Sequence, residues 1–202
     1  MATMMDSALG YAADGFPPER RSDVRHKAVL AVGKLIVGGH ERFCLVRDIS
    51  SGGMKVETTH APERGTLVTV EMRGLAPCRA RVAWRDGELA GLMFEEQQDV
   101  EVIGNRRADA SGWHARAPRF EVDRVAELRV DCRPKIVEVV NVSVGGARLR
   151  GVSGFDVNTA GQLLLGNGLA PLAGFVRWNA EDDIGFKFAT AIDRKSLMAL
   201  IG

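Results

Sequence analysis

The chain has 202 residues, of which 46% are hydrophobic and 26% are charged, and its net charge is +1. This balance is typical of a globular protein and excludes collagen-like repetition and extensive disorder. The near-neutral charge argues against a nucleic-acid-binding protein, because such proteins are usually strongly basic. The sequence has no apolar run of membrane-spanning length and no signal-peptide pattern at its start, so we expect a cytoplasmic protein without membrane insertion.

Neither the cysteines nor the histidines form a pattern that indicates catalysis or metal binding. Cys44, Cys78 and Cys132 are too far apart for metal-ligand spacing, and their odd number argues against a disulfide framework. We expect them to be small, buried, reduced side chains. The sequence contains no His-x-x-x-His pair, Gly-x-Ser-x-Gly elbow or Walker loop. We therefore expect no enzyme activity, no catalytic residue, no metal site and no cofactor.

The first notable feature along the chain is a basic segment, PPERRSDVRHK, at residues 17–27. It contains Arg20, Arg21 and Arg25. A guanidinium group can bind a phosphate or a guanine edge through two hydrogen bonds and can stack on a base. Taken alone, the segment is more simply explained as a solvated basic arm.

A polar motif follows, and it occurs twice. DISSGG at residues 48–53 reappears 93 residues later as NVSVGG at residues 141–146. A second block contains Trp84 in the first copy and Trp178 in the second, an offset of 94, and a glycine follows each tryptophan after seven residues. Blocks that keep their order and spacing indicate two homologous domains.

We expect the domains to span residues 17–97 and 119–202, each long enough for one small core. Residues 98–118 are polar and contain glycine and proline breakers, so they are interpreted as a linker.

Period-two patterning predicts β-strands in both copies. The apolar positions that we expect in the cores include Val68, Val70, Met72, Cys78, Trp84, Phe94, Trp178 and Phe188. Asp86-Gly87 predicts a hairpin turn, and residues 179–183 predict a longer turn at the matching place. Several short strands with turns between them favour an all-β fold of small antiparallel barrels or sandwiches.

One helix is expected, at the C-terminal end of the chain. Asp193 is a suitable N-cap, and Leu197, Leu200 and Ile201 form an apolar stripe.

Together, Arg21-x-x-x-Arg25 and Asp48-x-Ser50-x-x-Gly53 resemble the two signatures of the PilZ domain, a bacterial receptor family for the second messenger cyclic di-GMP. The tryptophan block resembles the last strands of that barrel. The resemblance covers residues 17–96 and, a second time, residues 118–201. It implies two small six-stranded antiparallel PilZ-type β-barrels with a short C-terminal helix.

The resemblance implies six ligand-binding residues: Arg20, Arg21, Arg25, Asp48, Ser50 and Gly53. The arginines would grip guanine edges and phosphates from an arm that becomes ordered when the ligand binds. The carboxylate and the hydroxyl would bind and orient guanine, and the glycine would keep the turn open. An arginine at position 20 would accompany a stacked pair of ligand molecules rather than one.

The second copy departs from the family pattern. We expect Arg124 to stand before the first strand as Arg25 does, but Phe120 occupies the position of its partner arginine, directly after Arg119. The loss of one guanidinium predicts weak binding or none, since a charge-assisted contact contributes roughly 1.5–3 kcal/mol. The motif at residues 141–146 is then a structural turn, and the domain serves as a docking or dimerising surface or completes the pocket of the first copy from outside.

The expected function is a receptor and adaptor that binds cyclic di-GMP through its first domain and relays the signal to an unidentified protein. A homodimer is left open. The alternative is a PilZ-like protein–protein interaction module that binds no nucleotide. An enzyme or an RNA-binding barrel is disfavoured, because the sequence lacks a nucleophile–base pair, a basic charge and rows of stacking aromatic residues.

Overall fold

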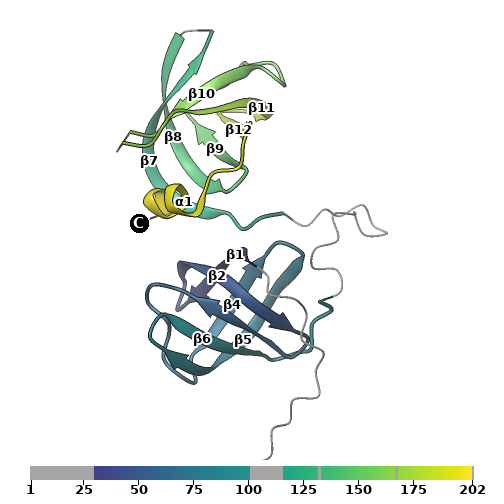
Figure 1. The fold of residues 1–202 in the computed structure, drawn as a ribbon. Coiled ribbons are helices and arrows are strands. Elements are labelled where there is room, and N and C mark those ends of the chain that lie inside the picture. Colours follow the sequence, from purple (N-terminus) through teal and green to yellow (C-terminus); the bar gives the residue numbers. More distant parts are fainter. Residues whose placement is uncertain (1–29, 101–115, 132, 167, 202) are drawn as a thin grey trace, which may run out of the picture.

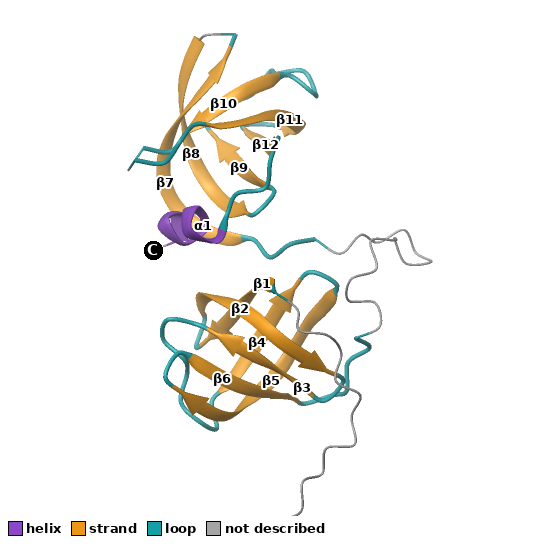
Figure 2. Ribbon diagram, viewed as in Figure 1, coloured by secondary structure: helices purple, strands orange, loops and turns teal. Residues whose placement is uncertain are grey.

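The computed structural model describes residues 30–100, 116–131, 133–166 and 168–201, which form twelve strands and one helix (Figures 1 and 2). The first six strands are β1 (Ala31–Val37), β2 (His40–Ser50), β3 (Gly53–Glu57), β4 (Leu67–Met72), β5 (Leu75–Asp86) and β6 (Leu89–Phe94). The other elements are β7 (Phe120–Val130), β8 (Arg133–Ser143), β9 (Gly146–Arg150), β10 (Ala160–Leu164), β11 (Leu172–Ala180), β12 (Asp183–Phe188) and α1 (Arg194–Ile201).

Each set of six strands closes into an antiparallel barrel. The strand order is β1-β2-β3-β6-β5-β4 in the first barrel and β7-β8-β9-β12-β11-β10 in the second. These orders are identical, since each strand of the second barrel is numbered six higher than its counterpart. The expected all-β fold of two six-stranded barrels with a short C-terminal helix is therefore confirmed. The exact domain boundaries stay predictions.

Alternating side chains fill the interior of each barrel. The period-two pattern correctly predicted the burial of Val68, Val70, Met72, Phe94 and Phe188. Cys44 and Cys78 are buried as free thiols, and burial raises their pKa values to about 12 and about 11. Both thiols are therefore protonated at neutral pH and behave as small apolar groups. Cys132 lies outside the described residues.

The repeated tryptophans lie outside the barrels, so the expectation that they belong to the cores is wrong. A bulge between Val82 and Trp84 shifts the register of β5, and Trp84 is 42% exposed. Its indole lies across Gly91, where an added Cβ would be 2.0 Å from the indole Nε1. Trp178 and Gly185 repeat this contact in the second barrel, at 2.1 Å. The repeated spacing of seven residues thus reflects a contact on the outer face.

Short turns join the last two strands of each barrel. Gly87 has a φ of 57°, which confirms the hairpin turn predicted between β5 and β6. The longer turn predicted at residues 179–183 is wrong, because Ala180 pairs with Asp183 and only two residues lie between them. Glu181 takes the positive φ that Gly87 takes in the first barrel, at 50°.

The C-terminal helix has the predicted cap and apolar stripe. Asp193 Oδ1 accepts a hydrogen bond from the Ser196 amide at 2.8 Å. Leu197 and Leu200 are buried in the core of the second barrel, and Ile201 packs against it. In Figure 1, α1 lies on the side of the second barrel that faces the first. No helix in the described ranges has the length and apolar character needed to cross a membrane.

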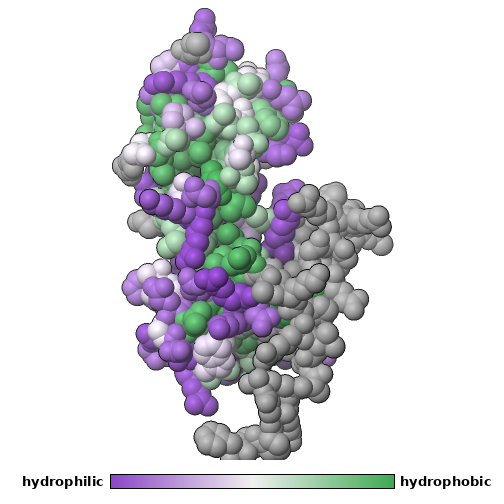
Figure 3. All heavy atoms as spheres, viewed as in Figure 1, coloured by the Kyte–Doolittle hydropathy of each residue, from purple (hydrophilic) through white to green (hydrophobic). Residues whose placement is uncertain are grey.

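Apolar side chains join the two barrels. Phe43 and Leu45 project from the outside of β2 and belong to the buried cluster of the second barrel. The rings of Phe43 and Phe120 lie 6.2 Å apart between centroids. On the face shown in Figure 3, hydrophobic residues run along the second barrel toward its junction with the first. The hydrophobic effect therefore favours association of the barrels.

A buried lysine adds polar contacts to the same junction. Lys34 Nζ lies 2.6 Å from Glu41 Oε1 and 3.1 Å from Glu71 Oε2, and it donates to the Arg119 carbonyl at 3.0 Å. Glu41 also accepts a hydrogen bond from the Glu121 amide at 2.9 Å. Burial alone would lower the pKa of Lys34, but the two carboxylates raise it above its usual 10.5. The lysine is therefore charged at neutral pH.

Candidate functional site

A bulge in β2 turns the first polar motif toward the outside of the barrel. The pairing between β2 and β3 shifts between Val46 and Asp48, so Arg47 is the extra residue. Val46 points into the barrel, and in a regular strand Asp48 would do so too. After the bulge, Ile49 is buried instead, and Asp48 is half-buried on the outer face. The bulge thus makes the carboxylate available to a ligand.

Ser50 and Gly53 close the turn that follows. The Ser50 hydroxyl donates to the Gly53 carbonyl at 3.3 Å. A Cβ at Gly53 would lie 2.3 Å from the Leu92 carbonyl oxygen, so a side chain cannot fit there. Neither Gly52 nor Gly53 has a positive φ. The glycine is therefore required by the close approach of β6 and not by a left-handed conformation.

The structure brings three of the six predicted ligand-binding residues together: Asp48, Ser50 and Gly53 lie at the β2–β3 turn. Arg20, Arg21 and Arg25 fall outside the described residues. Within the described ranges, no group of histidine, cysteine and acidic side chains is arranged to hold a metal ion.

Beside the motif, four adjacent strands present a row of outward-facing positions. Asp48 on β2 pairs with Lys55 on β3, which pairs with Gly91 on β6, which in turn pairs with Trp84 on β5. Sequence reasoning missed Lys55 as a candidate. The available signal was its position two residues after Gly53, since residues two apart share one face of a strand.

This row offers three kinds of interaction to a ligand. The Asp48 carboxylate can accept hydrogen bonds from the edge of a base, and the Lys55 ammonium can bind an anion. The Trp84 indole offers an apolar surface against which a base can stack. Because Gly91 has no side chain, the indole is the group that covers this part of the face.

The matching groups of the second barrel bind to their own neighbours. A bulge between Val139 and Asn141 repeats the one in β2. Arg119 donates to Asn141 Oδ1 at 3.2 Å, and Arg148 donates to Asp183 Oδ2 at 2.9 Å. In the first barrel, the side chains of Asp48 and of its neighbour Lys55 form no hydrogen bond or ion pair with the part of the chain that the structure describes. The two outer faces therefore differ in the polar groups they leave available.

The serine and glycine of the second motif have the same arrangement as those of the first. Ser143 donates to the Gly146 carbonyl at 3.3 Å, and its hydroxyl accepts a bond from the Gly145 amide at 3.3 Å. A Cβ at Gly146 would lie 2.5 Å from the Phe186 carbonyl. These contacts close the turn within the barrel in both copies.

The expected match between Arg124 and Arg25 is wrong. Strand pairing aligns Val37–His40 of the first barrel with residues 130–133 of the second, which matches Arg124 with Ala31 inside the strand. The Arg124 guanidinium donates to the carbonyls of residues 200 and 199 at 3.0 and 2.9 Å. It therefore caps the C-terminal end of α1.

The alignment of Arg119 and Phe120 with Arg20 and Arg21 stays a prediction, because those two arginines lie outside the described residues. Phe120 is fully buried, and its ring packs against Phe43. It therefore serves the packing between the barrels.

An ionic link connects the β2 bulge to the second barrel. Arg47 Nε donates to Glu57 Oε2 at 2.7 Å, and Arg194 at the start of α1 donates to Glu57 Oε1 at 3.2 Å. The Arg47 guanidinium is the main cause that lowers the pKa of Glu57, and Arg194 adds to it. Arg194 also lies over the Phe43 ring, at 5.6 Å. The residue next to Asp48 is thus joined to α1 through one carboxylate.

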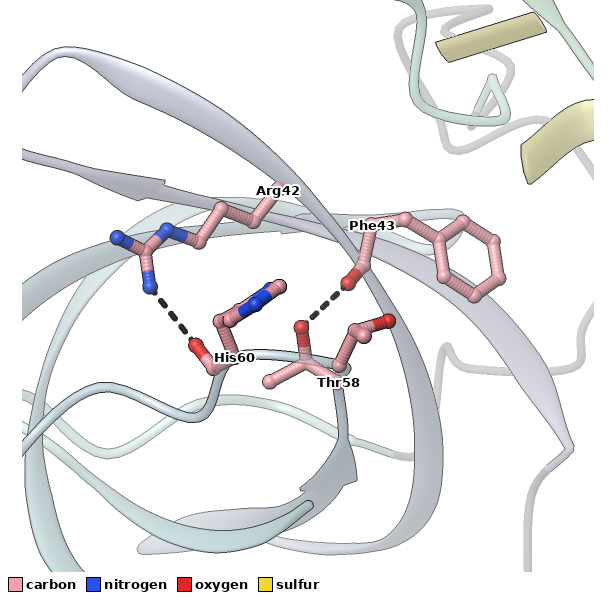
Figure 4. Close-up of a pocket in the computed structure, with 5 residues that line it drawn as sticks. Arg42, Phe43, Thr58 and His60 are labelled. Carbon is pink, nitrogen blue, oxygen red and sulfur yellow. Dashed lines mark hydrogen bonds between the residues drawn. The ribbon is translucent and has the colours of Figure 1, made fainter. Parts of the chain in front are cut away.

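A pocket beside β2 is separate from the motif (Figure 4). Its lining includes Arg42, Phe43, Thr58 and His60. Arg42 donates to the His60 carbonyl at 2.7 Å, and the Thr58 hydroxyl donates to the Phe43 carbonyl at 2.7 Å. These bonds hold the segment after β3 against β2, while the Phe43 ring points away from Arg42. Of the predicted ligand-binding residues that the structure describes, none lines this pocket.

Comparison with known families identifies the first part of the chain. Residues 19–105 match the PilZ domain family. This match covers the first barrel, and the second barrel repeats the strand order of the first. Comparison with curated protein sequences finds no match.

Several solved structures are similar to most of the chain at low sequence identity. The PlzA protein of Borreliella burgdorferi, in complex with c-di-GMP, is 10% identical, with a TM-score of 0.42, over 90% of this chain and 93% of that chain. The Bacillus subtilis inhibitor of motility is 13% identical, with a TM-score of 0.34, over 85% and 91%. The K. pneumonia MrkH–c-di-GMP complex is 12% identical, with a TM-score of 0.32, over 85% and 84%.

Proposed function

We propose that this protein is a cyclic di-GMP receptor that binds the dinucleotide on the outer face of its first barrel. The match of residues 19–105 to the PilZ domain family supports this function. The observation that carries it is the position of Asp48: the β2 bulge turns it outward, and its carboxylate has no hydrogen-bond or ion-pair partner among the described residues. Its counterpart Asn141 is already bonded to Arg119. Binding is therefore assigned to the first barrel and not to the second.

In this proposal, Arg21 and Arg25 bind the phosphates and guanine edges with their guanidinium groups. Asp48 accepts hydrogen bonds from guanine N–H groups, and Ser50 orients the base from the β2–β3 turn. Gly53 lets the ligand approach the backbone, and Arg20 brings in a second, stacked ligand molecule. The protein binds without catalysing a reaction.

The bound state is relayed through the second barrel to a protein partner. Binding orders the arm that carries Arg21 and Arg25 against the first barrel. The ligand also contacts the bulge, and the ionic link from Arg47 through Glu57 to Arg194 connects the bulge with α1. We propose that this route alters how the two barrels fit together.

Substitution of Asp48 tests the assignment to the first barrel. Asp48→Ala should weaken cyclic di-GMP binding by about tenfold to a hundredfold, because a hydrogen bond to a charged group contributes about 1.5–3 kcal/mol. Isothermal titration calorimetry measures the change. Asn141→Ala is the matched control and should leave the affinity unchanged. Equal affinity for the Asp48 variant and the unsubstituted chain would remove the support for this site.

A second candidate function is a protein–protein interaction module that binds no nucleotide. Two exposed apolar side chains on adjacent strands favour it: Val125 on β7 is 70% exposed and Ile136 on β8 is 67% exposed. This candidate predicts no heat of binding when cyclic di-GMP is titrated into the intact chain.

A further inference from the structure

Lys55 lies between the polar motif and the exposed indole of the first barrel. It pairs with Asp48 on one side and with Gly91 on the other, and it is half-buried. The two residues stand on adjacent strands, which lie about 4.8 Å apart, so one ligand can reach both side chains. Both side chains face outward from the same part of the barrel.

The counterpart of Lys55 in the second barrel is Arg148, whose guanidinium is already bound to a carboxylate. Arg148 pairs with Asn141 as Lys55 pairs with Asp48. Its guanidinium binds Asp183 through both Nε and a terminal nitrogen. Arg148 is also the main cause that lowers the pKa of Asp183. Arg148 therefore stabilises its own barrel.

A single difference in sequence leaves Lys55 without such a partner. Asp183 is the first residue of β12, and Leu89 is the first residue of β6, the matching strand. Leu89 pairs with Glu57, which is bound to arginines from β2 and α1. The Lys55 side chain forms no hydrogen bond or ion pair with any residue in the described ranges. Its ammonium group is therefore free to bind an anion.

An ammonium group beside a carboxylate suits a ligand that carries both an anionic phosphodiester and the N–H donors of a base. We propose that Lys55 binds a phosphate of the ligand while Asp48 holds the adjacent guanine. This inference rests on the proposed function and adds to it a phosphate-binding residue on the barrel itself. The ligand then spans β2 and β3, with the Trp84 indole beyond them.

Calorimetric titration of cyclic di-GMP into the full chain and its Lys55 variants tests this assignment. Lys55→Gln should lower the affinity about tenfold, and Lys55→Arg should restore most of it because the charge is kept. The affinity of Lys55→Gln should also fall less steeply with added NaCl, since one charge contact is missing. Lys187→Gln, on the outer face of the second barrel, is the control and should bind normally.

Leu89→Asp provides an independent test that leaves Lys55 in place. The new carboxylate would engage the lysine as Asp183 engages Arg148, and the affinity should fall by a similar factor. If the unsubstituted chain binds and both Lys55→Gln and Leu89→Asp bind equally well, the inference is overturned while the receptor function stands. A chain that does not bind cyclic di-GMP at all overturns both.

Discussion

Gly53 shows how one residue of the polar motif also supports the fold. Its backbone lies so close to β6 that a Cβ would be 2.3 Å from the Leu92 carbonyl oxygen. Gly146 has the same restriction in the second barrel, where Asn141 of the matching motif is already bonded to Arg119. The glycine would therefore be needed even in a barrel that binds no ligand.

Gly53→Ala should lower the free energy of unfolding by about 1–3 kcal/mol, because the added methyl group forces β3 and β6 apart. Urea denaturation followed by circular dichroism measures the change. Gly145→Ala is the control, since no atom lies within 4 Å of its added Cβ and the residue lacks a positive φ. The two variants should differ clearly, and equal denaturation midpoints would contradict the steric argument.

At the residue scale, the sequence predicted Asp48, Ser50 and Gly53 at one turn because their spacing is local. It did not predict Lys55, which becomes a candidate only when β2, β3 and β6 lie side by side. It also could not predict that Arg148 is occupied, because Asp183 lies 35 residues away in the chain. Such pairings are set by strand register.

At the scale of elements, the bulges decide which side chains face outward. The pattern predicted the strands and the C-terminal helix, since both follow from periodicity within one segment. It placed Trp84 inside the barrel, because a period-two rule has no means of counting the extra residue at position 83. The β2 bulge has the same consequence for Asp48, which it moves from the inside to the outer face.

The basic segment at residues 17–27 should become protected from protease when ligand binds. Trypsin cleavage after Arg20, Arg21 and Arg25 should slow in the presence of cyclic di-GMP, because the ligand holds these side chains against the first barrel. Mass spectrometry of timed digests measures each site. The Asp48→Ala variant, which binds weakly, should show little protection. Unchanged cleavage of the unsubstituted chain at saturating ligand would contradict the ordering of the arm.

At the scale of the whole molecule, the junction between the barrels combines apolar packing with a charged cluster. Phe43 and Phe120 supply the apolar contact, and Lys34 bridges two carboxylates and the Arg119 carbonyl. Removal of the lysine would leave two carboxylates close together without their cation. The sequence predicted two barrels but not this junction, which depends on contacts between distant residues.

Lys34→Met should lower the free energy of unfolding by about 1–3 kcal/mol at pH 7, less than a fully buried pair would, because both carboxylates remain partly exposed. Folding raises the pKa of Lys34 above 10.5, so the charged lysine stabilises the folded state. This stabilisation is complete below pH 10.5 and is lost as the pH rises through the higher folded-state pKa. Chemical denaturation measures both effects. Lys195→Met, at an exposed position on α1, is the control, and equal stability of the two variants would contradict the role of Lys34.

The central claim is that the first barrel and the arginines before it form a cyclic di-GMP receptor. Titration calorimetry of cyclic di-GMP into the full chain, beside Arg21→Ala and Arg25→Ala, tests it most directly. We expect saturable binding that either substitution weakens at least tenfold, with a stoichiometry that shows whether one or two ligand molecules bind. The claim would be contradicted if the intact chain did not bind, or if both variants bound as tightly as the intact chain.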